Sequence, residues 1–178
     1  MAISSAKPGK VRISNFLLDK FWNDVYGFQL KRTENENDAE DITIQTFSRA
    51  FDKIATYDER YTFTTWLTTI AKNLHIDLER KKKSSVNSKT TEVDEEHEQN
   101  IVDESPTPED KLIREQNLAR LLQDIKQLKP HYQEVINLRY FQELSYLEIA
   151  EELKEPINNV KVKLLRAKKL LAEIIQKN

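Results

Sequence analysis

The feature that most constrains this chain is a 24-residue stretch in its middle, residues 84–107, with almost no large apolar side chain and no helical periodicity. Residues 84–110 carry nine acidic side chains against one lysine, whereas the segments on either side carry a small excess of Lys and Arg. Such a stretch cannot recover the entropy of ordering by burying apolar surface. It therefore predicts a flexible acidic linker between two separate domains, residues 1–83 and residues 108–178.

Both flanking blocks show apolar residues at i, i+3 and i+4 spacing, and neither shows the period-two alternation of a half-buried strand. The pattern predicts an all-α protein made of two small helical domains. The expected helices cover residues 15–31, 37–54 and 63–83 in the first block, and 107–127, 130–138, 145–155 and 158–176 in the second.

Side-chain caps mark where several of these helices should begin. Asn37 with Glu40, and Ser145 with Glu148, have the spacing of a capping box. Thr107 followed by Pro108 has the order of an N-cap and a first helical residue. In the helix expected after Thr107, the leucines and isoleucine that we place on the buried side are Leu112, Leu118, Leu121, Leu122 and Ile125.

Composition argues against an enzyme, a metalloprotein and a membrane protein. The only two glycines, Gly9 and Gly27, are too far apart for a phosphate-binding loop or a nucleophile elbow. The three histidines are widely separated and there is no cysteine, so no metal-binding spacing or disulfide framework is present. We expect no catalytic residue, no metal and no cofactor. No long apolar run or secretory signal is visible, so we expect a cytoplasmic chain without membrane insertion.

Residues 145–169 have the layout of a helix-turn-helix: a short capped helix, a break that contains Pro156, and a longer helix with a polar, basic start. On the second helix an apolar stripe should face the core: Val160, Leu164, Ala167 and Leu171. The opposite and flanking sides are free for the DNA major groove, where asparagine suits adenine and Lys or Arg suits guanine. These positions are Asn158, Asn159, Lys161, Val162, Lys163 and Arg166.

A second informative stretch, residues 63–83, places aromatic residues beside polar and cationic ones and ends in four consecutive basic residues. Aromatic rings beside cations suit unstacked single-stranded bases, because every base has a π-face and every phosphate needs charge. Trp66 and Leu67 are expected in the core. Phe63 lies next to a polar loop, and the pattern does not decide whether its ring belongs to the core.

In the order and spacing of these motifs, the chain resembles a bacterial RNA polymerase sigma factor of the extracytoplasmic-function (ECF) type. The first block contains D-A-E-D-I at 38–42 with Q-T-F at 45–47, and F-x-x-W-L-x-x-I-A-K-N at 63–73. The second contains L-S-Y-L-E-I-A-E-E-L at 144–153, ahead of V-K-x-x-L-x-R-A-K-K-L at 160–170. The family often has glycine in the turn, where this chain has Lys154 and Asn158.

The resemblance implies a promoter-specificity factor that directs core RNA polymerase and performs no chemistry itself. The first domain, with region 2 of the family as its counterpart, would bind the clamp helices of the largest polymerase subunit and open the minus-10 element. The second domain, the counterpart of region 4, would bind the polymerase flap and read the minus-35 element. The resemblance leaves open whether an anti-sigma factor covers the chain.

Residue by residue, the resemblance assigns Asp41 and Gln45 to the clamp helices, and Phe63 with its preceding loop to a flipped minus-10 base. Lys72, Asn73 and Arg80 would lie along the same strand. In the second domain the minus-35 contacts would be Asn158, Asn159, Lys161, Lys163 and Arg166, with Arg139 and Ser145 as further contacts to the DNA backbone.

Two rival functions remain open at this point. An ordinary helix-turn-helix repressor or activator would bind duplex DNA without polymerase, but it leaves the motifs at 38–83 unexplained. A sigma-like module that only sequesters a regulator would have no need of the cations on the last helix.

Overall fold

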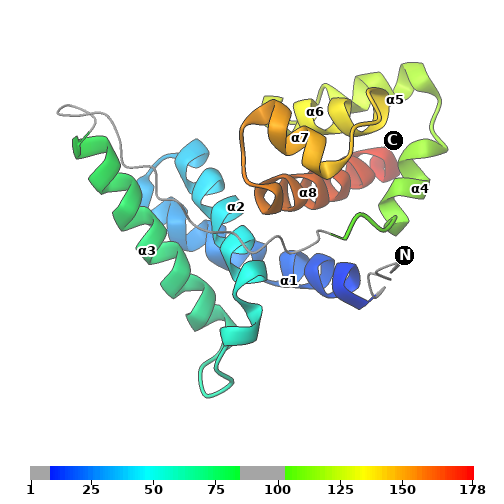
Figure 1. Ribbon diagram of the computed structural model, residues 1–178. Coiled ribbons are helices and arrows are strands. Elements are labelled where there is room, and N and C mark those ends of the chain that lie inside the picture. Colours follow the sequence, from blue (N-terminus) through cyan, green and yellow to red (C-terminus); the bar gives the residue numbers. More distant parts are fainter. Residues whose placement is uncertain (1–8, 85–102) are drawn as a thin grey trace. The chain divides into compact units, whose positions relative to one another are not determined.

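The computed structural model describes residues 9–84 and 103–178, with side chains from residue 13 onward (Figure 1). Within these ranges all regular elements are helical, which confirms the all-α prediction. The described residues form two compact units: residues 19–84, and residues 103–178 grouped with residues 9–18. Most of the expected linker, residues 85–102, lies outside the described residues.

The N-terminal unit is built from residues 19–33 of α1 (Gly9–Thr33), from α2 (Glu36–Asp52), the short 3-10 turn η1 (Ile54–Thr56) and α3 (Phe63–Ser84). Helices α2 and α3 pack along each other, as Figure 1 shows in cyan and green. Its core is mainly apolar, and the rings of Trp22 and Phe47 stack with their centroids 5.8 Å apart. The fully or nearly fully buried residues include Trp22, Val25, Ile42, Phe47, Leu67, Ala71 and Leu74.

The joint between α1 and α2 corrects the predicted start of the second helix. The N-cap is Asn35, whose Oδ1 accepts hydrogen bonds from the amides of Asn37 at 2.9 Å and Asp38 at 3.0 Å. The expected capping box of Asn37 with Glu40 is therefore wrong. The reason is Glu34, whose φ of 52° reverses the chain directly after α1, so that the next cap falls at once on Asn35.

The C-terminal unit wraps five shorter elements around a long last helix. Its elements are α4 (Pro108–Arg114), α5 (Leu118–Ile125), α6 (Pro130–Ile136), the π-helical turn η2 (Asn137–Phe141), α7 (Tyr146–Leu153) and α8 (Ile157–Lys177). Helix α8 packs against α4, α5, α6 and α7, and it is the central element of the core. The largest fully buried side chains here are Tyr132, Ile113, Ile136, Ile149, Leu164 and Leu171.

The single helix expected over 107–127 is wrong, because the chain breaks between α4 and α5. Asn117 starts a new helix by accepting hydrogen bonds from the amides of Ala119 and Arg120. The break changes which apolar residues face inward. Ile113, Leu121 and Ile125 are buried. Leu118 and Leu122 are 59% and 44% exposed, so the prediction that they lie in the core is wrong.

The helix-turn-helix geometry is confirmed by α7 and α8. Ser145 and Glu148 form the expected capping box, and the apolar stripe of α8 is completely buried. Val162, which we expected on a flanking side, is also buried, because α8 is covered from several directions by the helices around it.

The turn between α7 and α8 depends on Lys154, which has a φ of 53° and ψ of 45° in the left-handed region. The amide of Glu155 closes the turn by donating to the carbonyl of Ala150 at 3.1 Å. A side chain with a Cβ is disfavoured in this conformation, and glycine is the usual residue at such a helix end.

We therefore expect Lys154→Gly to raise the free energy of unfolding of the C-terminal unit by about 0.5–1 kcal/mol. Chemical denaturation followed by circular dichroism measures the change. Lys154→Ala is the matched control, because it removes the same charge and keeps the Cβ. Equal stability of the two variants would show that the backbone conformation at this position carries no cost.

One polar network lies inside the C-terminal unit and joins α4, η2 and α8. The Asp110 carboxylate accepts hydrogen bonds from the Thr107 amide at 2.6 Å, from the Lys168 ammonium at 3.0 Å, and from the Tyr140 hydroxyl. Asp110 is 8% exposed and Lys168 only 3%. Thr107 is thus confirmed as the N-cap of α4, with Pro108 in the first turn and Asp110 completing a capping box.

The pKa values in this network are set by burial and by pairing. Burial by itself raises the pKa of Asp110, but the charge of Lys168 and the hydrogen bonds from Thr107, Tyr140 and Lys168 outweigh it and lower the pKa. For Lys168 burial prevails over the attraction of Asp110, and the pKa is lowered. Burial, together with the hydrogen bond to Asp110, raises the pKa of Tyr140.

Candidate nucleic-acid interface

An aromatic cluster lies at the start of α3, where the N-terminal unit was expected to meet single-stranded DNA. Phe63 is half-buried, and its ring centroid lies 4.9 Å from that of Phe21, 5.2 Å from Tyr57 and 5.4 Å from Trp66. Trp66 is also half-buried, so only Leu67 of the expected pair is fully in the core. The ring of Phe63 is held in place by its neighbours while part of it stays accessible to solvent.

The loop before α3 is ordered by its own side chains. The Tyr57 hydroxyl donates to the carbonyl of Tyr61 at 2.6 Å, and Arg60 forms an ion pair with Asp58 at 2.5 Å. This pairing lowers the pKa of Asp58 and raises that of Arg60. Tyr61 itself is 60% exposed beside Phe63, a position that the sequence analysis did not single out. The end of this loop therefore carries two accessible aromatic side chains, Tyr61 and Phe63.

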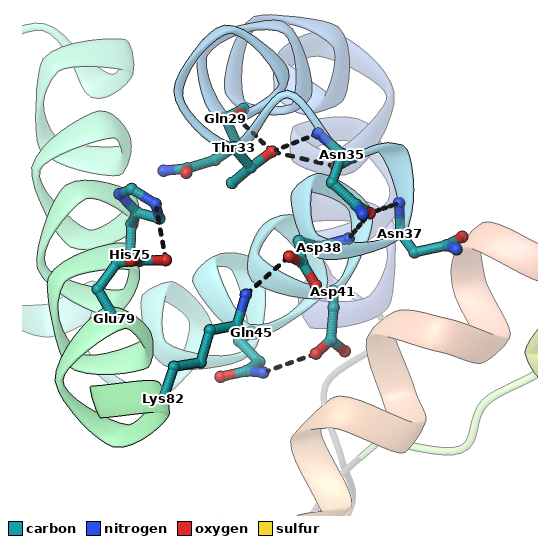
Figure 2. A network of polar contacts seen from close by, with 10 residues as sticks. All are labelled: Gln29, Thr33, Asn35, Asn37, Asp38, Asp41, Gln45, His75, Glu79 and Lys82. Atoms are coloured by element: carbon teal, nitrogen blue, oxygen red, sulfur yellow. Dashed lines mark hydrogen bonds and ion pairs between the residues drawn. The ribbon is translucent and has the colours of Figure 1, made fainter. Parts of the chain in front are cut away.

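The cationic side chains expected along the minus-10 strand share the solvent-exposed surface of α3. Lys72, Asn73 and Arg80 are all exposed, about two to four helical turns beyond the aromatic cluster. At the end of the helix Lys82 is paired with Asp38 of α2 at 2.9 Å, as Figure 2 shows. This pair joins the basic end of α3 to the acidic first turn of α2.

The two residues assigned to polymerase lie together on α2. Asp41 is exposed and Gln45 is half-buried, and the Gln45 side-chain amide donates to the Asp41 carboxylate at 3.4 Å (Figure 2). Their i, i+4 spacing puts both on one face of the helix. Their neighbours Ile42 and Thr46 are buried, so Asp41 and Gln45 lie on the more accessible side of α2.

The residues assigned to the minus-35 element all lie on the first half of α8, but they differ in accessibility. Asn158, Asn159 and Arg166 are partly exposed. Lys161 and Lys163 are each only 8% exposed, and the Lys163 ammonium lies 2.5 Å from the Glu155 carboxylate. The structure therefore brings the expected set together on one helix, with the asparagines at its N-terminal end and Lys163 in an ion pair.

The residues assigned to the DNA backbone meet at the start of α7. Arg139 donates to the Leu144 carbonyl at 2.9 Å and lies over the Tyr146 ring at 4.9 Å. Glu104 lies at the same place, and its carboxylate accepts a hydrogen bond from the Tyr146 amide at 2.5 Å. Sequence reasoning placed Glu104 in the flexible linker, because nothing in an acidic run distinguishes one carboxylate that is bound from its neighbours.

Within residues 9–84 and 103–178, no three potential metal ligands come close enough together to hold an ion. In the same part of the chain, no helix has the length and apolar character needed to cross a bilayer.

Comparison with known families now gives the class of protein. Residues 17–85 match the family described as Sigma-70 region 2, and residues 118–171 match that described as Sigma-70, region 4. These two domains, in this order and on an all-helical chain, are those of an RNA polymerase sigma factor.

Individual relatives show to which group of sigma factors the chain is similar. The ECF RNA polymerase sigma factor SigW of Bacillus subtilis (strain 168) is 33% identical over 173 residues, 95% of this chain and 92% of the relative. RNA polymerase sigma factor YlaC of the same strain is 32% identical over 154 residues, 85% of this chain and 86% of the relative. A solved RsbN–BldN complex contains a chain 26% identical to this one, covering 97% of this chain and 99% of its own length, with a TM-score of 0.40.

The chain therefore belongs to the ECF RNA polymerase sigma factors. It directs core RNA polymerase to promoter DNA and is not an enzyme, as the sequence analysis predicted. The rival interpretations, a free-standing helix-turn-helix regulator and a module that binds no DNA, are set aside by the match to both sigma domains.

Proposed function

We propose that promoter recognition is divided between two domains with the boundaries expected from the sequence. Residues 1–83 would bind the polymerase clamp helices and the melted minus-10 element, and residues 108–178 would read the minus-35 duplex. Residues 84–107 would connect them. The positions of the two family matches, 17–85 and 118–171, support this division.

The observation that carries the minus-10 assignment is the aromatic cluster at the start of α3. Phe63 is fixed by three neighbouring rings yet remains partly accessible, and the exposed side chains of Lys72, Asn73 and Arg80 follow along the same helix. A fixed ring loses little entropy when a base stacks on it, and nearby cations neutralise the strand's phosphates. The arrangement supports capture of an unstacked base.

The minus-35 assignment is supported by the N-terminal half of α8. In a helix-turn-helix this end of the second helix enters the major groove. Asn158 and Asn159 lie there and offer amides for adenine, while Arg166 lies two turns further on. Lys161 and Lys163 would also contact this DNA, and for Lys163 the ion pair with Glu155 would first have to break.

The polymerase assignment is supported by the outward face of α2, where Asp41 and Gln45 lie side by side. We infer that the protein acts in the cytoplasm, where its polymerase works, and its lack of cysteine suits that reducing compartment. An anti-sigma factor remains an expected additional partner.

Transcription reconstituted with core polymerase on a promoter library tests the minus-10 assignment. Removal of one stacking ring costs about 1–3 kcal/mol per base, so Phe63→Ala should reduce promoter-dependent transcripts about 5- to 150-fold. Phe51→Ala is the matched control, since Phe51 is also a half-buried phenylalanine of the N-terminal unit, with its ring 6.1 Å from Phe47.

Potassium permanganate footprinting of the melted strand in the same reactions separates a defect in promoter opening from a defect in polymerase binding. Loss of opening with retained polymerase binding is the expected result. Equal transcript levels for Phe63→Ala and Phe51→Ala would remove Phe63 from the promoter interface.

A further inference from the structure

The segment 103–107, which we call the acidic strap, binds to the start of α7 through Glu104. One oxygen of the Glu104 carboxylate accepts the amide of Tyr146 at 2.5 Å, and the other lies 3.6 Å from the Arg139 guanidinium. Glu104 and Tyr146 are 42 residues apart in the sequence, so this is a tertiary contact. The carboxylate is held between a backbone amide and a cation.

The groups that hold this carboxylate are those that hold a phosphate oxygen in other proteins. Tyr146 is the first residue of α7, and its amide points out of the positive end of the helix. Arg139 is kept in position by its hydrogen bond to the Leu144 carbonyl and by the Tyr146 ring. A guanidinium beside free helix amides favours any anion with oxygen acceptors.

The first helix of a helix-turn-helix crosses the DNA backbone. The resemblance to sigma factors assigns contacts with that backbone to Arg139 of η2 and to Ser145, the N-cap of α7. The Glu104 carboxylate therefore occupies the place that a backbone phosphate of the minus-35 element would need.

We infer that Glu104 is an internal competitor of DNA: in the free protein it fills the phosphate position at the start of α7, and duplex binding displaces it. This inference rests on the proposed function of the C-terminal unit and adds to it a contact that weakens DNA binding. The strap is then an autoinhibitory element within the chain, directly upstream of the helix-turn-helix domain.

The strap is built so that it can be released. Asp103 is only 6% exposed, and its Oδ2 has no hydrogen-bond partner among the described residues, while its Oδ1 is bound only by the neighbouring Ser105. A buried carboxylate oxygen without a partner opposes binding of the strap. The side chain of Glu104 is itself 37% exposed. A phosphate can therefore replace it without unfolding the domain.

The experiment compares the full-length wild type with Glu104→Gln and with Glu115→Gln, using fluorescence anisotropy with a labelled random-sequence DNA duplex at several salt concentrations. A backbone contact is independent of sequence, so a random duplex reports it. Glutamine keeps the shape of the side chain and an acceptor for the Tyr146 amide. Glu115 is the control, because it is an exposed acid of the same unit, 3.9 Å from Lys111, and its loss changes the net charge equally.

We expect Glu104→Gln to bind the duplex about three- to tenfold more tightly than the control, which corresponds to a strap bound in roughly 70–90% of free molecules. For Glu104→Gln the slope of log affinity against log salt should be larger in magnitude by about one. The reason is that a salt anion replaces the Glu104 carboxylate beside Arg139 and is released when DNA binds. In an Arg139→Gln background, Glu104→Gln should give no such gain.

Each alternative result has a defined meaning. If Glu104 only stabilises the domain, Glu104→Gln binds DNA no better than Glu115→Gln and unfolds at a lower temperature, and the competition is overturned. A gain that persists in the Arg139→Gln background overturns it as well. A wild-type chain that binds no duplex, alone or with core polymerase, overturns the proposed function of the C-terminal unit itself.

Discussion

Asp110→Ala is expected to lower the free energy of unfolding of the C-terminal unit by about 3–5 kcal/mol, the usual cost of leaving one member of a buried ion pair without its partner. The substitution leaves the Lys168 ammonium, 3% exposed, without a counter-charge. It also removes the acceptor of the Thr107 amide and of the Tyr140 hydroxyl. Denaturant unfolding followed by the circular dichroism of the full chain measures the loss.

A double-mutant cycle with Lys168→Met isolates the pair. The double variant should recover part of the loss, because a buried methionine needs no counter-charge, whereas Thr107 and Tyr140 remain without their acceptor. Lys111→Ala, at the exposed pair with Glu115, is the control and should cost at most about 1 kcal/mol. If Asp110→Ala costs no more than this control, the buried network does not stabilise the fold.

The same network determines how the free energy of unfolding changes with pH. Because the pKa of Asp110 is lower in the folded than in the unfolded protein, its contribution is complete above the unfolded pKa of about 4. It is lost as the pH falls through the lower, folded value. The difference in stability between wild type and Asp110→Ala should therefore shrink on acidification below about pH 4.

Phe47→Ala is expected to have the corresponding effect on the N-terminal unit, with a loss of about 3–5 kcal/mol. Phe47 is completely buried, stacks on Trp22 at 5.8 Å and contacts the ring of Phe51 at 6.1 Å. Its removal leaves a cavity between α1 and α2 that neighbouring side chains cannot fill without moving. Promoter-dependent transcription should fail with it, since region 2 has to be folded to bind polymerase.

Hydrogen exchange measured by mass spectrometry on the full chain shows which unit is affected. Each unit has its own core, so peptides from α2 and α3 should lose protection while those from α6 and α8 keep it. Phe51→Ala, which removes a half-buried ring, is the control and should have a smaller effect. Equal loss of protection in both units would show that they unfold as one.

Local signals accounted for much of the fold. Ser145 with Glu148, Thr107 with Pro108, and the apolar stripe of α8 were all predictable, because caps and periodicity depend on residues within a few positions of one another. The break at Asn117 was missed because the leucines on either side continue a helical spacing. Only the cap formed by the Asn117 side chain interrupts it.

The features that the sequence did not reveal depend on contacts between distant residues. Lys168 looks like one more cation on a basic helix, and only the packing of α4 against α8 shows that it is buried against Asp110. In the same way Glu104 is one of many acids until the fold brings it to Tyr146. The predicted contacts to DNA and polymerase came from motif resemblance, and they remain predictions to be tested by the variants above.

The two tryptophans of the chain, Trp22 and Trp66, both lie in the N-terminal unit. Trp22 is buried against Phe47, and Trp66 belongs to the half-exposed cluster around Phe63. Selective excitation of indole therefore reports on one half of the protein only, without any added dye. A base that stacks beside Phe63 would quench the emission of Trp66, so binding of a single-stranded DNA to the isolated factor can be followed without a label.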